Sequence, residues 1–145
     1  MSVNIPIGFA LLQVKTEQFA VIEGNYKESE KVELNTSLEF KVSHDTKAIG
    51  VFIKFIFEQA KCPFLIVQVS CHFNILDSSW EGFGVGEDGA VIIPKNLLQH
   101  LGMITVGTAR GVLHAKTEGT TLNKFFIPTV NVVEMVTDDG AFLKK

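Results

Sequence analysis

The chain has 145 residues, of which 46% are apolar, and its formal net charge at neutral pH is −3. This composition excludes an intrinsically disordered chain, and the lack of any run of Lys or Arg gives no basis for binding to nucleic acid or to a membrane surface. The length fits one domain with its own core, so we expect residues 1–137 to form that domain and residues 138–145 to be a flexible C-terminal tail.

The first half of the chain predicts four β-strands. Residues 9–22 form a long apolar segment with a kink, and a charged crossover loop follows at 24–31. Residues 32–42 alternate strictly between apolar and polar side chains, which is typical of an antiparallel strand with one buried face. Residues 51–58 and 64–75 are expected to be the third and fourth strands, joined by a short hairpin connection.

The third and fourth strands carry apolar side chains on both faces. The row of odd-numbered residues from 65 to 75 is the more continuous one, so we expect it to face the core. The opposite face would then present one patch of large side chains, made of Phe52, Ile56, Phe64 and Ile66. A small monomeric domain seldom exposes such a patch, so we expect it to contact either a bound polypeptide or Phe125 and Phe126 of the same protomer, with a groove between them.

The second half of the chain predicts a long helix between two shorter elements. Residues 80–89 are rich in glycine and are expected to be a hinge, and Pro94 is suited to begin a helix that continues to Thr117. Residues 125–136 form a closing apolar element, either a strand or a short helix. Four strands followed by a helix predict an α+β fold, with a four-stranded antiparallel sheet and the long helix packed on one face.

Three glycines interrupt the predicted helix, at Gly102, Gly107 and Gly111. Each costs up to ~1 kcal/mol relative to alanine. Small residues suit positions where another backbone packs closely. We therefore expect an oligomer interface on this helix, made of these glycines together with Leu101 and Ile104.

No motif in the sequence supports catalysis or a bound cofactor. Residues 84–89 match G-x-G-x-x-G, but acidic side chains surround them and no parallel strand–helix unit frames them. Cys62, Cys71 and His72 lack the second ligand pair of a zinc site. No nucleophile elbow or paired carboxylate occurs either. We therefore expect a non-enzymatic protein without metal or cofactor.

The expected compartment is the cytoplasm. The N-terminal segment has no basic region before an apolar one, and no apolar run approaches the ~20 residues of a membrane-spanning helix. Two cysteines in a chain of this size do not require a disulfide framework and suit a reducing environment.

Taken in order, several segments carry a resemblance to a known family. They are the strand at 64–75, Leu101-Gly102 and Ala109-Arg110 in the helix, and Pro128 and Asn131 before an apolar end. The chain from about residue 9 to residue 136 resembles the SecB protein-export chaperone family, including the SecB-like chaperones associated with toxin–antitoxin systems.

The resemblance implies a homo-oligomer, a dimer or a tetramer, in which protomers pair through their sheets and pairs stack through the long helix. It also implies a client groove lined by aromatic side chains, to which Tyr26, Phe125 and Phe126 correspond. Docking on the SecA motor does not carry over, because the sheet face that is acidic in SecB here includes Lys41 and Lys54.

The expected function is that of an ATP-independent chaperone, which binds unfolded or extended polypeptides through apolar grooves. One alternative is a dedicated partner of a single protein, such as a toxin–antitoxin or phage component. Another is a small-ligand-binding α+β domain.

Overall fold

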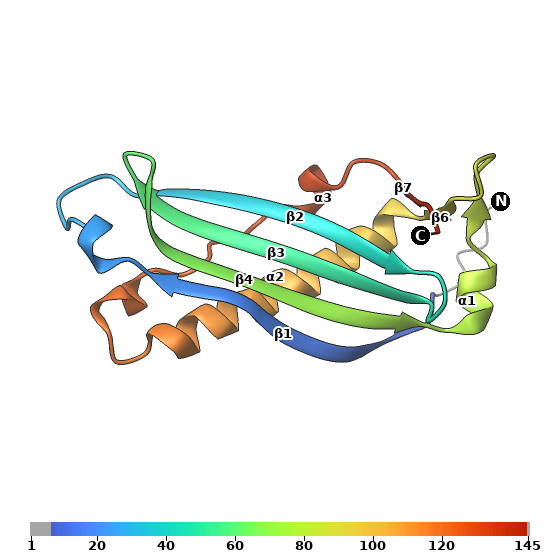
Figure 1. The fold of residues 1–145 in the computed structure, drawn as a ribbon, viewed down its shortest axis with the longest axis horizontal. Coiled ribbons are helices and arrows are strands. Elements are labelled where there is room, and N and C mark those ends of the chain that lie inside the picture. The colour runs from blue at the N-terminus through green and yellow to red at the C-terminus, as the bar shows by residue number, and fades with distance from the viewer. Residues whose placement is uncertain (1–6, 145) are drawn as a thin grey trace.

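The protein is an α+β fold built on one four-stranded antiparallel sheet, as predicted (Figure 1). A computed structural model describes residues 7–144. The strands are β1 (Phe9–Val21), β2 (Glu33–Ser43), β3 (Ala48–Gln59) and β4 (Cys62–Ile75), and they lie in the order β1-β4-β3-β2. Both β1 and β2 are therefore edge strands.

The connections follow from local backbone chemistry. A crossover segment that contains the 3-10 helix η1 (Glu23–Asn25) carries the chain from β1 across to β2 at the other edge. Strands β3 and β4 are joined at Ala60 and Lys61, which both have positive φ angles, of 49° and 66°. Two consecutive residues with positive φ are what a two-residue hairpin turn requires if it is to match the twist of the strands.

One face of the sheet is covered by the long helix α2 (Lys95–Thr117), which crosses the strands obliquely behind the sheet in Figure 1. Pro94 is the residue just before the helix, where its missing N–H does not matter. The helix buries Leu98, Leu101, Thr105 and Ala109, which recur at three- and four-residue spacing. The other face of the sheet, called the open face below, has no helix or strand packed on it among the described residues.

The alternation of side chains along β3 shows how the sequence selects the covered face. Ile49, Val51, Ile53 and Phe55 are fully buried between the sheet and α2, whereas the residues between them are half-exposed on the open face, apart from Gly50, which has no side chain to expose. Because successive side chains on a strand point to opposite faces, a single apolar row fixes which face packs against the helix.

The predicted hinge at 80–89 and part of the predicted tail are ordered elements. The chain forms α1 (Asp77–Glu81), and then a small sheet of β5 (Gly84–Val85), β6 (Val91–Ile93) and β7 (Gly140–Phe142). The G-x-G-x-x-G motif forms β5 and most of the turn that leads to β6, and Gly89 in this turn has a φ of 82°. The hinge prediction is therefore wrong. The tail is not loose throughout, because residues 140–142 pair with β6.

After α2 the chain returns along the helix as a strap, defined here as residues 125–136. It follows the 3-10 helix η2 (Thr121–Lys124) and includes the short helix α3 (Val132–Met135). Arg110 fastens the strap to α2, because its Nε donates to the Ile127 carbonyl at 2.8 Å and its guanidinium donates to the Pro128 carbonyl at 2.9 Å. Within residues 7–144, no helix is long and apolar enough to cross a membrane.

Candidate peptide-binding cleft

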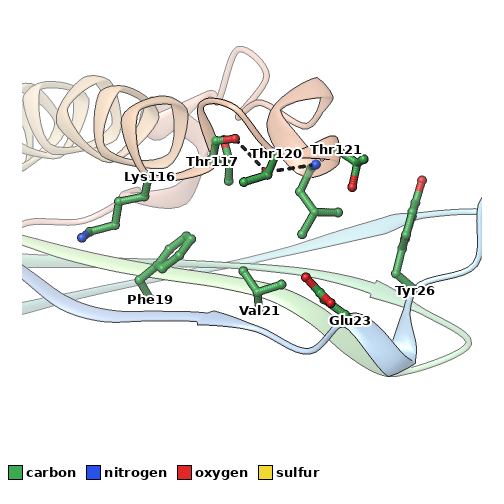
Figure 2. A pocket seen from close by; sticks show the side chains of 9 residues that line it. Phe19, Val21, Glu23, Tyr26, Lys116, Thr117, Thr120 and Thr121 are labelled. Atoms are coloured by element: carbon green, nitrogen blue, oxygen red, sulfur yellow. Dashed lines mark hydrogen bonds between the residues drawn. The ribbon is translucent and has the colours of Figure 1, made fainter.

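A cleft of about 460 Å³ opens where the end of β1, the crossover segment and the C-terminal end of α2 meet. Figure 2 shows the side chains that line it from both sides, with the sheet below and the helix end above. Its apolar part consists of Phe19, Val21, Tyr26 and Leu122. Its polar rim consists of Glu23, Lys116, Thr117, Thr120 and Thr121.

The sheet side of the cleft is set by the register of β1. Strand β1 pairs with β4 with irregularities between Leu11 and Gln13 and between Thr16 and Gln18. Beyond the second irregularity, Phe19 lies opposite Val67 and Val21 lies opposite Leu65, both of which are buried on the helix-covered side. Phe19 and Val21 therefore point toward the helix.

The helix ends too early to cover these two residues. Helix α2 stops at Thr117, and Gly119, with a φ of 81°, turns the chain away. Val21 consequently keeps 39% of its surface exposed. The Lys116 ammonium lies 5.7 Å from the centre of the Phe19 ring, so the aromatic face at the cleft mouth is bordered by a cation.

The threonines on the helix side hold the cleft wall in place. Thr120 Oγ donates to the Thr117 carbonyl at 2.7 Å and accepts from the Leu122 N–H at 3.2 Å, and both bonds are drawn in Figure 2. Thr117 Oγ donates back to the Leu113 carbonyl at 2.8 Å. Because these hydroxyls are bonded to neighbouring backbone groups, this wall of the cleft is held in place.

Tyr26 forms the far wall as part of an aromatic cluster. Its ring centre lies 4.9 Å from that of Phe64 and 5.6 Å from that of Phe125, and Phe57 completes the cluster at 5.8 Å from Phe125. Rings packed edge to face or tilted at such distances stabilise one another beyond the area that they bury. The cluster thus makes one end of the cleft rigid.

The structure divides the residues predicted to bind peptide among three places. Tyr26 lines the cleft, and Phe125 supports it from within the aromatic cluster. Phe126 points elsewhere and is 69% exposed beside a second groove of about 430 Å³, between the strap and Met103 of α2. Phe52, Ile56 and Ile66 are half-exposed on the open face, as predicted, but this face lies on the other side of the sheet from the cleft.

Phe64 was expected on the open face with these residues, and this prediction is wrong. Phe64 is fully buried on the helix side. The reason is a bulge, because Phe57 pairs with Leu65 while Glu58 pairs with Pro63, which leaves Phe64 as the extra residue of β4. An extra residue breaks the alternation of faces, so Phe64 and Leu65 are both buried.

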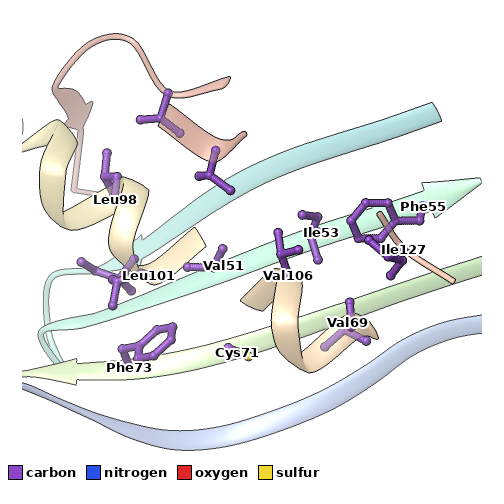
Figure 3. Close-up of a cluster of buried hydrophobic side chains, with 14 of the residues drawn as sticks. Val51, Ile53, Phe55, Val69, Cys71, Phe73, Leu98, Leu101, Val106 and Ile127 are labelled. Carbon is purple, nitrogen blue, oxygen red and sulfur yellow. The ribbon is translucent and has the colours of Figure 1, made fainter. Parts of the chain in front are cut away.

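The residues predicted to form an oligomer interface on α2 lie in different environments, some buried and some exposed. Leu101 is fully buried in the core (Figure 3). Gly102 packs against Val132 of α3, so neither residue is available to a second copy. Ile104 is half-buried against the core. Gly107 and Gly111 lie on the exposed side of the helix, and a Cβ placed on either would meet nothing within 4 Å.

The edge of β1 leads directly to the cleft. Among the described residues this strand has a partner on one side only, and its residues 10–17 are all exposed. Leu11, Leu12 and Val14 keep 48%, 66% and 44% of their surface exposed. The opposite edge strand, β2, shows the contrasting pattern, because its exposed positions are polar or charged.

Sequence reasoning did not identify Phe19, Val21 or Leu122 as parts of a site. Phe19 and Val21 were visible as the apolar end of the first strand, but the early end of the helix that uncovers them was not. No sequence pattern marked Leu122, because its position depends on the turn after Thr117.

Among residues 7–144, no group of three His, Cys, Asp or Glu side chains is placed to hold a metal ion.

Comparison with known proteins adds little to this description. No protein-family model matches the chain, and no curated protein matches it. One solved structure, described as a protein of unknown function from Streptococcus agalactiae, is similar over 87% of this chain and 99% of its own, at 14% sequence identity and a TM-score of 0.38.

Proposed function

We propose that this protein binds unfolded or extended polypeptide segments, without ATP, in the cleft beside the crossover segment. The observation that carries the proposal is that β1 leads into the cleft along an outer edge that pairs with no other described strand and exposes Leu11, Leu12 and Val14. An extended chain that pairs with this edge gains backbone hydrogen bonds that do not depend on sequence.

The side chains of such a segment would be recognised separately from its backbone. Every second side chain would point toward the helix-covered side, where Leu11 and Val14 are exposed and where the cleft opens beyond Phe19. Large apolar side chains at alternating positions would therefore be preferred. Unfolded chains expose such side chains and folded ones bury them, which gives the selectivity of a holdase.

The proposal includes self-association in the cytoplasm. Gly107 and Gly111 leave the outer side of α2 flat, and Met103, one turn before Gly107, is 56% exposed. A flat helix surface next to an exposed apolar side chain lets a second helix approach closely. This surface is separate from the cleft, so an oligomer would keep the cleft free for clients.

The test is suppression of the aggregation of denatured model proteins. Val21→Asp places a charge on the sheet side of the cleft without removing a buried side chain, and Val85→Asp is the matched control, since Val85 is 73% exposed in β5. We expect the unmodified protein and Val85→Asp to suppress the aggregation of several unrelated proteins, and Val21→Asp to lose this ability. If the unmodified protein protects none of them, the holdase proposal fails and a dedicated partner becomes the better explanation.

A further inference from the structure

The crossover segment forms one wall of the cleft, although few of its side chains pack on the rest of the protein. Glu23 and Tyr26 line the cleft from this segment, and Figure 2 shows both below the end of the helix. The side chains of residues 27–31, which follow, are all exposed. The aromatic cluster holds the Tyr26 ring, but the backbone of the segment depends on hydrogen bonds for its position.

A buried glutamine at the end of β3 makes most of these hydrogen bonds. Gln59 is only 2% exposed. Its Oε1 accepts from the Lys27 N–H at 2.8 Å, and its Nε2 donates to the Lys27 carbonyl at 2.7 Å and to the Glu30 carbonyl at 3.2 Å. One side-chain amide therefore satisfies three backbone groups of the crossover segment.

The position of Gln59 in β3 shows that this role is not one of ordinary core packing. Gln59 continues the buried row that includes Phe55 and Phe57, where the other side chains are apolar. Lys27 presents one backbone donor and one acceptor to this site. A carboxylate only accepts and an ammonium only donates, whereas an amide does both. A buried polar side chain is unfavourable unless it is hydrogen-bonded, and here both polar atoms of the amide have partners.

A second set of hydrogen bonds fixes the other side of Tyr26. Asn25 Nδ2 donates to the Pro63 carbonyl at 2.8 Å, and the Ile22 N–H donates to the Phe64 carbonyl at 2.8 Å. Tyr26 therefore lies between two residues, Asn25 and Lys27, that are each bonded to the end of the β3–β4 hairpin. Because neighbouring Cα atoms are only about 3.8 Å apart, Tyr26 cannot move far unless one of these bonds breaks.

We propose that Gln59 is a positioning residue of the cleft, which holds the crossover wall and Tyr26 in their binding arrangement before a client arrives. Gln59 does not line the cleft and acts through Lys27. A wall that is fixed in advance removes the entropic cost of ordering it when a client binds. The inference rests on the proposed function, because it explains how the same cleft binds.

The first measurement concerns the wall alone, without a client. Gln59→Met replaces the amide with an apolar side chain of similar size, so the hydrogen bonds are lost without a large cavity. We expect amide hydrogen exchange of residues 22–31 to become faster, while circular dichroism shows that the fold is kept. Asn25→Ala, which removes the bond on the other side of Tyr26, should have a smaller effect of the same kind.

The second measurement is the binding of a fluorescently labelled, reduced and carboxymethylated protein as the unfolded client. If the loosened wall is in its binding arrangement for about a tenth of the time, the apparent affinity falls about tenfold. For Gln59→Met this loss should lie in the association rate, with little change in the dissociation rate, because the bound client keeps its contact with Tyr26. Loss of a client contact would instead increase the dissociation rate.

Two control variants separate positioning from general stability. Asn74→Leu removes a side-chain amide bond of 2.9 Å to the Thr46 carbonyl, at the other end of the sheet. Ile49→Val lowers stability by truncating a fully buried side chain at that same end. Neither variant should change the exchange of residues 22–31 or the association rate of the client.

The outcomes distinguish this inference from the proposed function. If the unmodified protein binds no unfolded client, the proposed function fails and the role of Gln59 in binding fails with it. If the unmodified protein binds the client but Gln59→Met associates equally fast, or exchanges equally slowly at residues 22–31, the proposed function stands and the positioning role is overturned. If Gln59→Met does not fold, Asn25→Ala decides the question by the same two measurements.

Discussion

Substitution of two phenylalanines, Phe64 and Phe52, provides a quantitative test of which side of the sheet is the core. They lie in the neighbouring central strands β3 and β4. In the structure, Phe64 is fully buried, whereas Phe52 is half-exposed on the open face. Their replacement by alanine should therefore have very different consequences.

The expected loss for Phe64→Ala is set by burial and by its ring contacts. Truncation of a buried phenylalanine costs about 3–5 kcal/mol, because transfer and cavity terms add. The upper half of that range is expected, since the Phe64 ring packs on those of Tyr26 and Phe125 at 4.9 and 5.2 Å, and Phe57 lies at 6.4 Å. Phe52→Ala should cost only about 1 kcal/mol, because its ring already contacts water.

Urea unfolding followed by circular dichroism measures both values. With a slope of about 2 kcal/mol per molar urea, Phe64→Ala should lower the unfolding midpoint by about 2 M, and Phe52→Ala by about 0.5 M. A domain of this size has a total stability of only about 5–15 kcal/mol, so Phe64→Ala removes a large part of it. Equal midpoints for the two variants would show that the bulge at Phe64 and the packing of the aromatic cluster are wrong.

Three further predictions concern assembly, the strap and pH. Gly107→Leu should lower the mass of the oligomer measured by sedimentation, because a large side chain blocks the close approach of a second α2. If the unmodified protein is itself a monomer, the helix interface is contradicted. Arg110→Met should destabilise the fold by about 1.5–3 kcal/mol and increase amide hydrogen exchange in the strap, because the Ile127 and Pro128 carbonyls lose a charged donor. Unchanged exchange would contradict the role of Arg110 in holding the strap. Burial, followed by the charge of Lys15 and opposed by Glu17, lowers the pKa of His72. Between the lowered pKa of His72 in the folded protein and its ordinary value, the unfolded chain binds more protons than the folded one. The free energy of unfolding should therefore decrease as the pH falls through this range. His72→Gln should flatten this part of the plot of stability against pH.

The strands could be predicted from the sequence because their side chains alternate without interruption. In β2 each apolar residue from Leu34 to Val42 lies on the covered side, and in β3 the row from Ile49 to Phe57 does the same. One buried row decides the face of a whole strand. The long helix could also be predicted, because its apolar residues follow the helical period up to Thr117.

The misplaced residues are those whose position depends on an irregularity. Phe64 changes face through one extra residue in β4, and no side-chain pattern marks that bulge. The glycines at 84–89 suggested a hinge, but β5 pairs with β6, and β6 is paired on its other side with β7 from near the end of the chain. Phe19 and Val21 became part of a cleft because the helix ends before it covers them, which is a property of tertiary packing and not of local sequence.

The most direct test of the peptide-binding cleft is photo-crosslinking from inside it. Thr121 lines the cleft and is exposed, so a benzoylphenylalanine placed there should react with a bound chain without disturbing the core. The same group at Val85 is the control, because this residue is exposed in the small sheet and does not line the cleft. With a permanently unfolded, reduced and carboxymethylated protein as client, we expect a crosslinked product from position 121 that an excess of unlabelled client removes, and none from position 85. Equal products from both positions, or none from position 121, would contradict binding in this cleft.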